Sequence, residues 1–150
     1  MNINRNAPIV AAHEIAIGAD IQTVWSALTE IDRWPDWNAD TPKAQLTGPL
    51  AVGTVFNWKT GQLTLSTRIT EITPPERFAW SGDANGILAI HVWVLAQTQD
   101  GTHVRTEESW EGNGVPGPVD PVQAALDALH VRWLSALKMR AEGLRSNVSS

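Results

Sequence analysis

The sequence has 150 residues, of which 43% are hydrophobic and 18% are charged, and its formal net charge at pH 7 is −5. This length and composition exclude a disordered or fibrous chain and predict a single domain over residues 1–150. The chain has no cysteine, which excludes disulfides and thiolate catalysis, and its negative charge disfavours nucleic acid as a partner.

The first third of the chain predicts a strand followed by two helices. Residues 10–17 alternate in the manner of a strand, with His13 on the face that we assign to the core. Asp20 is expected to cap the start of a helix with an apolar face, and Asp32 to cap a second, very short helix. The two helices should form a helix–turn–helix pair.

The middle of the chain predicts only strands, because turn-forming glycines and prolines separate short apolar runs. The connections are tight, so neighbouring strands should run antiparallel in a meander. The six expected strands are 43–47, 54–60, 63–73, 76–82, 87–98 and 102–111.

A long helix from Asp120 to about Leu144 is predicted to end the chain, with one apolar stripe facing the sheet. A strongly twisted sheet of seven strands curls, and this helix should lie in its concave side. The predicted fold class is therefore α+β helix-grip: a seven-stranded curved antiparallel sheet wrapped around a long C-terminal helix, with two short helices after the first strand. We expect a cavity of about 300–1,000 Å³ between the helix and the sheet.

Three stretches resemble the SRPBCC group, the START-like superfamily, in its polyketide cyclase/dehydrase-like branch. They are residues 17–25 (IGADIQTVW), 34–38 (WPDWN) and 69–80 (ITEITPPERFAW), and the resemblance covers residues 10–144. It implies a helix-grip fold with a buried pocket for a small apolar or aromatic molecule, polyketide-like or lipid-like. These motifs encode turns and core contacts, so they do not identify the ligand.

Glu108 and His13 are the candidate catalytic residues. The alternation of 102–111 directs Glu108 inward, where burial would raise the pKa of the carboxyl group and make it a general acid or base. His13 has a side chain suited to proton transfer near neutral pH. The alternative interpretation is structural: a partnered carboxylate for Glu108, and a core histidine satisfied by the backbone for His13.

The candidate ligand-binding residues are mostly aromatic, since the chain has eight tryptophans and no tyrosine. Indole rings offer flat apolar walls with an N–H group at the edge, although each ring taken alone also fits ordinary core packing. Both faces of the strand that contains His91 are apolar, so the sequence does not decide whether His91 points to the cavity or to the outer face. The residues expected to bind the ligand are Phe56, Trp58, Phe78, Trp80, His91, Thr106, Trp110, Leu129 and Trp133.

Three functions remain open, and with them the question whether the protein is an enzyme. The first is binding of a small hydrophobic or aromatic molecule with cyclase- or dehydratase-type proton transfer. The second is a non-catalytic carrier or sensor, and the third is an interaction protein of the heat-shock-ATPase activator-homologue type.

We expect no cofactor and no metal, because the four histidines lack an i, i+4 pair and no cysteine assists them. No run approaches the roughly 20 apolar residues of a membrane span, and no signal peptide is evident. A cytoplasmic protein is therefore expected, with a homodimer left open.

Overall fold

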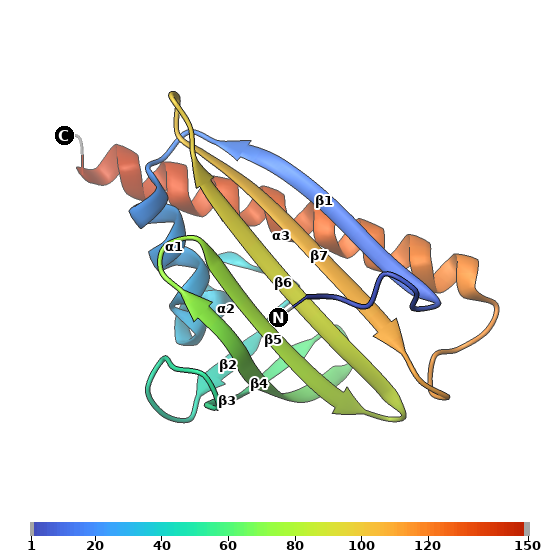
Figure 1. The fold of residues 1–150 in the computed structure, drawn as a ribbon. Helices are drawn as coiled ribbons and strands as arrows, with labels where there is room; N and C mark the ends of the chain where they lie inside the picture. The colour runs from blue at the N-terminus through green and yellow to red at the C-terminus, as the bar shows by residue number, and fades with distance from the viewer. Residues whose placement is uncertain (1, 149–150) are drawn as a thin grey trace.

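The computed structural model describes residues 2–148, with side chains from 2 to 144. Seven antiparallel strands form one sheet in the order β1-β7-β6-β5-β4-β3-β2, and three α-helices complete the fold (Figure 1). The strands are β1 (Ile9–Ile17), β2 (Lys43–Leu46), β3 (Val55–Thr60), β4 (Leu63–Thr73), β5 (Arg77–Ala84), β6 (Ile87–Gln97) and β7 (Thr102–Glu111). The helices are α1 (Ile21–Thr29), α2 (Trp34–Trp37), which follows a 3₁₀ turn at Ile31–Arg33, and α3 (Val119–Val148).

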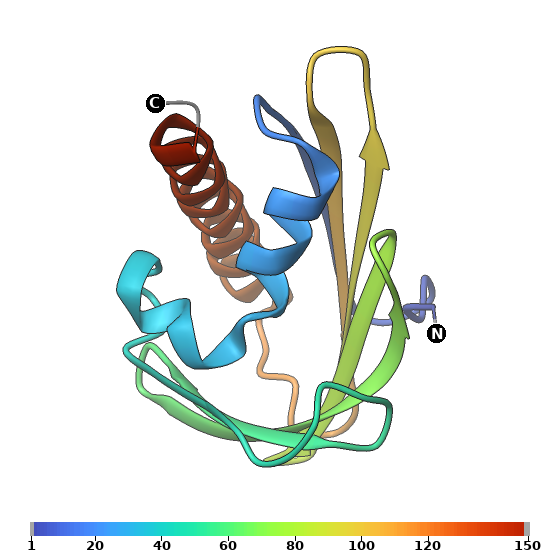
Figure 2. The ribbon, with the colours of Figure 1, turned by 90° about the vertical axis from the view of Figure 1, so that its left-hand side faces the viewer.

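The predicted helix-grip fold is confirmed. The sheet curls, and α1, α2 and α3 all lie on its concave side (Figure 2). In this arrangement the apolar face of the sheet and the apolar stripe of α3 pack against each other, so both are buried. Within residues 2–148, no helix combines the length and the apolar character needed to cross a membrane.

The two expected helix caps are wrong in detail. Asp20 occupies the position before α1, but its carboxylate accepts a hydrogen bond from the Thr23 hydroxyl and makes no cap hydrogen bond to the helix backbone. Asp32 lies inside the 3₁₀ turn, which runs directly into α2 and leaves it no helix start to cap. Its carboxylate instead accepts the backbone N–H of Leu46 at 2.6 Å, which ties this segment to β2.

One half of the interior is filled by aromatic rings. Trp34 is fully buried, and four ring centroids lie 5.4–5.6 Å from its own. Its indole nitrogen donates to the backbone oxygen of Leu28 at 2.9 Å, so the short helix α2 is fastened to α1 and to the core at once. The four rings around Trp34 belong to Phe56, Trp58, Trp80 and Trp133.

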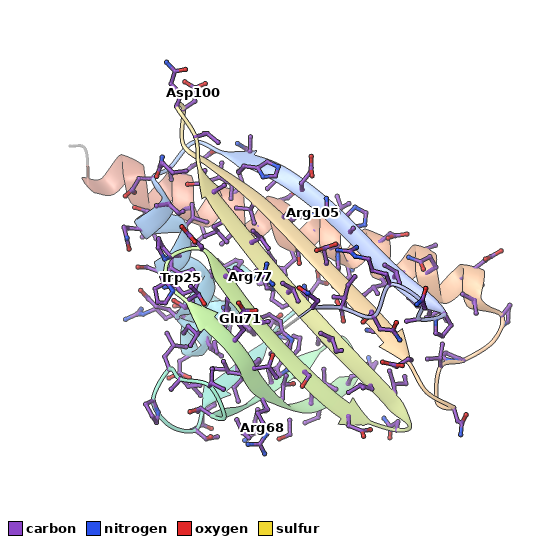
Figure 3. All side chains as sticks on the ribbon, in the orientation of Figure 1. Trp25, Arg68, Glu71, Arg77, Asp100 and Arg105 are labelled. Carbon is purple, nitrogen blue, oxygen red and sulfur yellow. The ribbon has the colours of Figure 1, made fainter. Side chains whose placement is uncertain are left out.

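The convex side of the sheet carries charged pairs and the N-terminal segment, which crosses it in Figure 1. On this side Arg77 donates to Glu71 at 2.9 Å, and Arg105 also points away from the helices (Figure 3). Glu107 on β7 lies on this side too, but it is only 8% exposed because the segment around Arg5 covers it. The charged side chains on this side are thus separated from the interior by the sheet.

The hairpin between β5 and β6 extends two residues further than predicted. Its tip, Asn85 and Gly86, has φ angles of 56° and 76°, the left-handed pair typical of a tight two-residue turn. The backbone N–H of Gly114 donates to the oxygen of Gly86 at 2.9 Å, and a side chain at Gly114 would collide with the backbone of Asn85. This close approach fixes the loop that leads into α3, and so the start of α3 over the sheet.

Candidate functional site

The other half of the interior holds a cavity of about 200 Å³, between the N-terminal half of α3 and strands β3 to β7. It is smaller than the predicted range, because the aromatic rings described above fill the rest of the concave space. A shallow groove of about 310 Å³ adjoins it and shares Trp110, Leu126 and Leu129 with it. The cavity is lined by Trp58, Thr60, Leu63, Leu65, Ser66, Thr67, Trp80, Gly82, Ala84, Asn85, Ile87, Ala89, Glu108, Trp110, Leu126 and Leu129.

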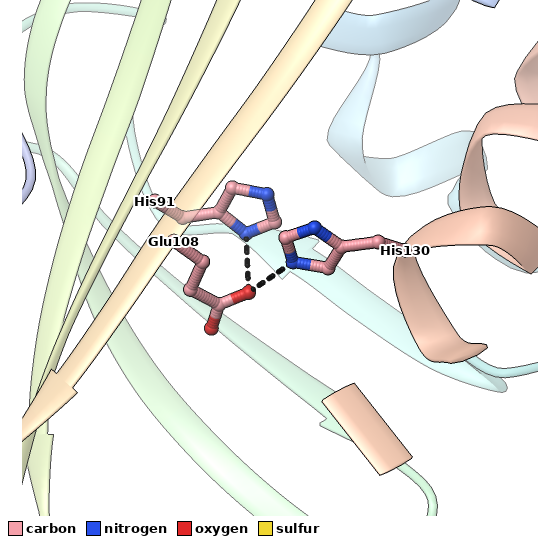
Figure 4. Close-up of side chains that lie close together, drawn as sticks. All are labelled: His91, Glu108 and His130. Carbon is pink, nitrogen blue, oxygen red and sulfur yellow. Dashed lines mark hydrogen bonds and ion pairs between the residues drawn. The ribbon is translucent and has the colours of Figure 1, made fainter. Parts of the chain in front are cut away.

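A polar cluster lies at the boundary between the filled half and the cavity, and consists of His91, Glu108 and His130 (Figure 4). The sheet register sets His91 on β6 directly opposite Glu108 on β7, and α3 supplies His130 from above. His130 Nε2 donates to Glu108 Oε1 at 2.8 Å, and His91 Nδ1 lies 3.2 Å from the same oxygen. Glu108 alone of the three reaches the cavity wall.

Glu108 points inward as predicted, but its pKa moves in the opposite direction. Burial alone would raise the pKa, whereas the neighbouring His91 and the hydrogen bonds from His130 and Trp110 lower it to about 2. The Trp110 indole nitrogen donates to Oε2 at 2.7 Å, so both carboxylate oxygens have a donor. The expectation of a carboxyl group with a raised pKa is therefore wrong, and Glu108 is an anion at neutral pH.

His91 faces the concave side of the sheet. The sequence alone did not decide between this side and the convex one. Burial lowers the pKa of its imidazole to about 3, so the ring is neutral at neutral pH. With the Nδ1 proton toward the Glu108 carboxylate, Nε2 accepts the hydroxyl of Thr106 at 2.6 Å. His91 and Thr106 are both buried and both outside the cavity lining. In this structure Thr106 is hydrogen-bonded to His91, and His91 contacts Glu108, so the two residues position the carboxylate rather than line the cavity.

His13 lies on the concave side too, but its partner is Asp127 on α3. Its Nε2 donates to the Asp127 carboxylate at 2.8 Å, so neither a contact with Glu108 nor a purely backbone-satisfied histidine is found. Its ring meets that of His130 edge-on, with 5.4 Å between the centroids. His13 therefore touches the polar cluster only through His130.

The structure divides the expected ligand-binding residues between the cavity and the core. Trp58, Trp80, Trp110 and Leu129 line the cavity. The remaining members, Phe56, Phe78, His91, Thr106 and Trp133, are buried in the core outside the lining. Strand alternation distinguishes the inner from the outer side of a sheet, but it does not say which inward residues meet an empty space.

His130 is the main residue that sequence reasoning missed. It lies on the apolar stripe of α3, four residues after Leu126 and three before Trp133, and is 1% exposed. An ionisable side chain at a core position of an otherwise apolar helix face is the signal that would have identified it.

The three cluster residues also have the composition of a metal site, and their ligand atoms lie within 4.8 Å of one another. The spacing argument overlooked this grouping because the residues come from three different elements. The His91 and His130 rings are stacked, with 9° between their planes. In this structure Glu108 Oε1 occupies the point that both histidine nitrogens face.

A sequence profile of the family described as "Polyketide cyclase / dehydrase and lipid transport" matches residues 8–142. The chain belongs to this family. The SRPBCC, START-like relationship inferred from the sequence is thereby confirmed.

Known relatives of this polyketide cyclase/dehydrase family member agree in fold. The START superfamily protein of Mycobacterium smegmatis superposes with a TM-score of 0.76 at 15% identity, over 90% of this chain and 98% of that one. The di-domain aromatase/cyclase StfQ of the steffimycin biosynthetic pathway gives a TM-score of 0.76 at 14% identity, over 93% of this chain and 53% of that one. At these identities the likeness shows the fold alone.

A curated relative by sequence is the oxopyrrolidines biosynthesis cluster protein O of Penicillium oxalicum. It is 28% identical to this chain, over 64% of this chain and 59% of the fungal protein. The chain therefore matches only about three-fifths of the length of that relative.

Proposed function

We propose that this protein binds a small apolar, aromatic molecule in the cavity beneath the N-terminal half of α3. The observation that carries the proposal is an apolar hollow of about 200 Å³ in an interior whose other half is closely filled by rings. Protein interiors are normally packed without such voids, and an apolar cavity of roughly 150 Å³ already binds benzene. A bicyclic aromatic molecule that extends toward the adjoining groove is of suitable size.

The lining supports an aromatic ligand in particular. Trp58, Trp80 and Trp110 come from three strands and present indole rings to the same space, while Leu126 and Leu129 close it from α3. Flat rings of this kind gain from stacked or edge-on contacts beyond the gain from burial alone.

Filling the cavity tests the proposal. Ala89→Phe would place a ring in the hollow, and we expect it to abolish the quenching of tryptophan fluorescence by 2-naphthol. Ala96→Phe, on the exposed end of the same strand, is the matched control and should bind as the unaltered protein does. Equal binding by both variants would place the ligand elsewhere. Native mass spectrometry of freshly purified protein would show whether a small molecule accompanies it.

A second candidate function is cyclase- or dehydratase-type proton transfer on the bound molecule. One observation favours it: Glu108 lies in the cavity wall and is hydrogen-bonded to His130, whose Nδ1 is buried without a hydrogen-bond partner among the described residues. In this role Glu108 would take the proton from the bound molecule, and the hydrogen bond from His130 Nε2 would hold its carboxylate in place. A carboxylate with a pKa of about 2 is by itself a weak base, however, so binding is the primary proposal.

Turnover separates the two functions. Under the catalytic hypothesis, Glu108→Gln keeps binding but loses cyclisation of an added aryl β-diketone by roughly 100-fold or more. Product formation can be followed by mass spectrometry. If the unaltered protein binds the diketone and leaves it unchanged, the carrier or sensor function stands instead.

A further inference from the structure

The charge in the cavity wall is of one sign. Glu108 is the only charged residue among the described residues that line it, and the other lining groups are apolar or neutral. Arg105, on the same strand as Glu108, points to the convex side and pairs with Glu14 there at 3.1 Å. A ligand that enters the cavity therefore meets a negatively charged residue and no positively charged residue among the described residues of the lining.

The carboxylate of Glu108 also has a free acceptor position. Oε1 has the two histidine nitrogens as neighbours, which uses both of its lone pairs. Oε2 accepts only the Trp110 indole among the described residues, so its second lone pair remains available. The Glu108 side chain is 12% exposed.

We propose, building on the binding function above, that the cavity selects aromatic molecules that carry a hydroxyl or amino donor and are neutral or cationic, and that it rejects carboxylates and phosphates. Glu108 Oε2 accepts the donor of the ligand, and the indole rings hold its apolar body. An anionic ligand would bring a second negative charge into an apolar space without a compensating partner, which is strongly unfavourable. Glu108 is the specificity-determining residue.

Three naphthalenes of similar size and shape test the inference at pH 7. 2-Naphthol is a neutral donor, 2-methoxynaphthalene lacks the donor, and 2-naphthoate is an anion. By titration calorimetry, we expect 2-naphthol to bind at least about 10-fold more tightly than 2-naphthoate, and several-fold more tightly than the ether.

Glu108→Gln removes the charge at nearly constant shape and should bring 2-naphthol and 2-naphthoate to within about threefold of each other. Glu14→Gln makes the same change in net charge on an exposed side chain and should leave the ratio unchanged. If Glu108→Gln does not fold, the ratio in the unaltered protein still decides the matter.

The outcomes separate the two proposals. If none of the three compounds binds, the cavity is not a ligand site and the binding function fails. If they bind in the cavity, but 2-naphthoate binds as tightly as 2-naphthol, only the inferred selectivity is overturned. Equal affinity of 2-naphthol and its methyl ether would overturn the role of the donor.

Discussion

Glu108 and His91 show how a pair of ionisable residues is accommodated in an apolar interior. The carboxylate keeps its charge because nitrogen atoms of His91, His130 and Trp110 surround it, while His91 gives up its charge because it is buried. The two pKa shifts leave Glu108 charged and His91 neutral, but both make the stability of the protein fall as the pH is lowered.

Acidification should destabilise the protein through both residues. The pKa of Glu108 falls from 4.5 to about 2 on folding, so its contribution is present above pH 4.5 and is lost as the pH falls toward 2. The pKa of His91 falls from 6.5 to about 3, so the unfolded state gains the proton first, and stability falls from pH 6.5 downward.

Urea unfolding at pH 7, 5.5 and 4 should therefore give a free energy of unfolding that falls as the pH is lowered. The dependence of this free energy on pH should be smaller in His91→Gln. His103→Gln, on an exposed histidine, is the control. Equal slopes in the unaltered protein and His91→Gln would contradict the neutral, buried state of His91.

Sequence alone placed Glu108 inside but could not give it partners. Alternation along one strand fixes a side of the sheet, whereas the pairing of His91 with Glu108 depends on the register between β6 and β7. His130 depends further on how α3 lies across the sheet. The direction of the pKa shift was consequently wrong, because it was judged from apolar neighbours along the strand.

At the scale of elements, α3 carries both the core and the site. Its C-terminal half buries Trp133, Leu134 and Leu137 against the aromatic rings, and its N-terminal half covers the cavity. The stripe and its register were predictable because helical spacing is a local property of the sequence. The strands were likewise bounded to within one or two residues by their turn signals.

Trp133→Ala should lower the free energy of unfolding by roughly 3–5 kcal/mol, because Trp133 is 2% exposed and touches several rings. Val131→Ala, at a position 53% exposed on the same helix, should change it by less than about 0.5 kcal/mol. Thermal or urea unfolding measures both. A Trp133 variant of unaltered stability would mean that the helix face is misplaced.

For the whole molecule, the interior is divided into a filled half and a hollow half with the polar cluster between them. This division could not be predicted from the sequence, since it depends on where the eight tryptophan side chains pack in the interior. It also explains how the fold can retain a void: the filled half provides the stability, so the hollow half need not be close-packed.

A ligand in the hollow half should stabilise the whole domain. At 100 times its Kd, a ligand adds about 2.7 kcal/mol to the free energy of unfolding, which corresponds to roughly 5–10 °C in Tm for a domain of this size. Scanning calorimetry with 2-naphthol measures the shift. Fluorescence quenching without a shift in Tm would indicate stacking on a surface tryptophan rather than binding in the cavity.

The N-terminal segment on the convex side has a consequence for how the sheet opens. Ile3 covers Ile90 and Val92 there, while Trp93 of the same strand is buried on the concave side, so β6 is shielded on both sides and flanked by β5 and β7. β2 lies at the edge and pairs with β3 alone. Amide hydrogen exchange should therefore be slowest in β6 and fastest in β2, with opening that starts at that edge and reaches β6 only on global unfolding.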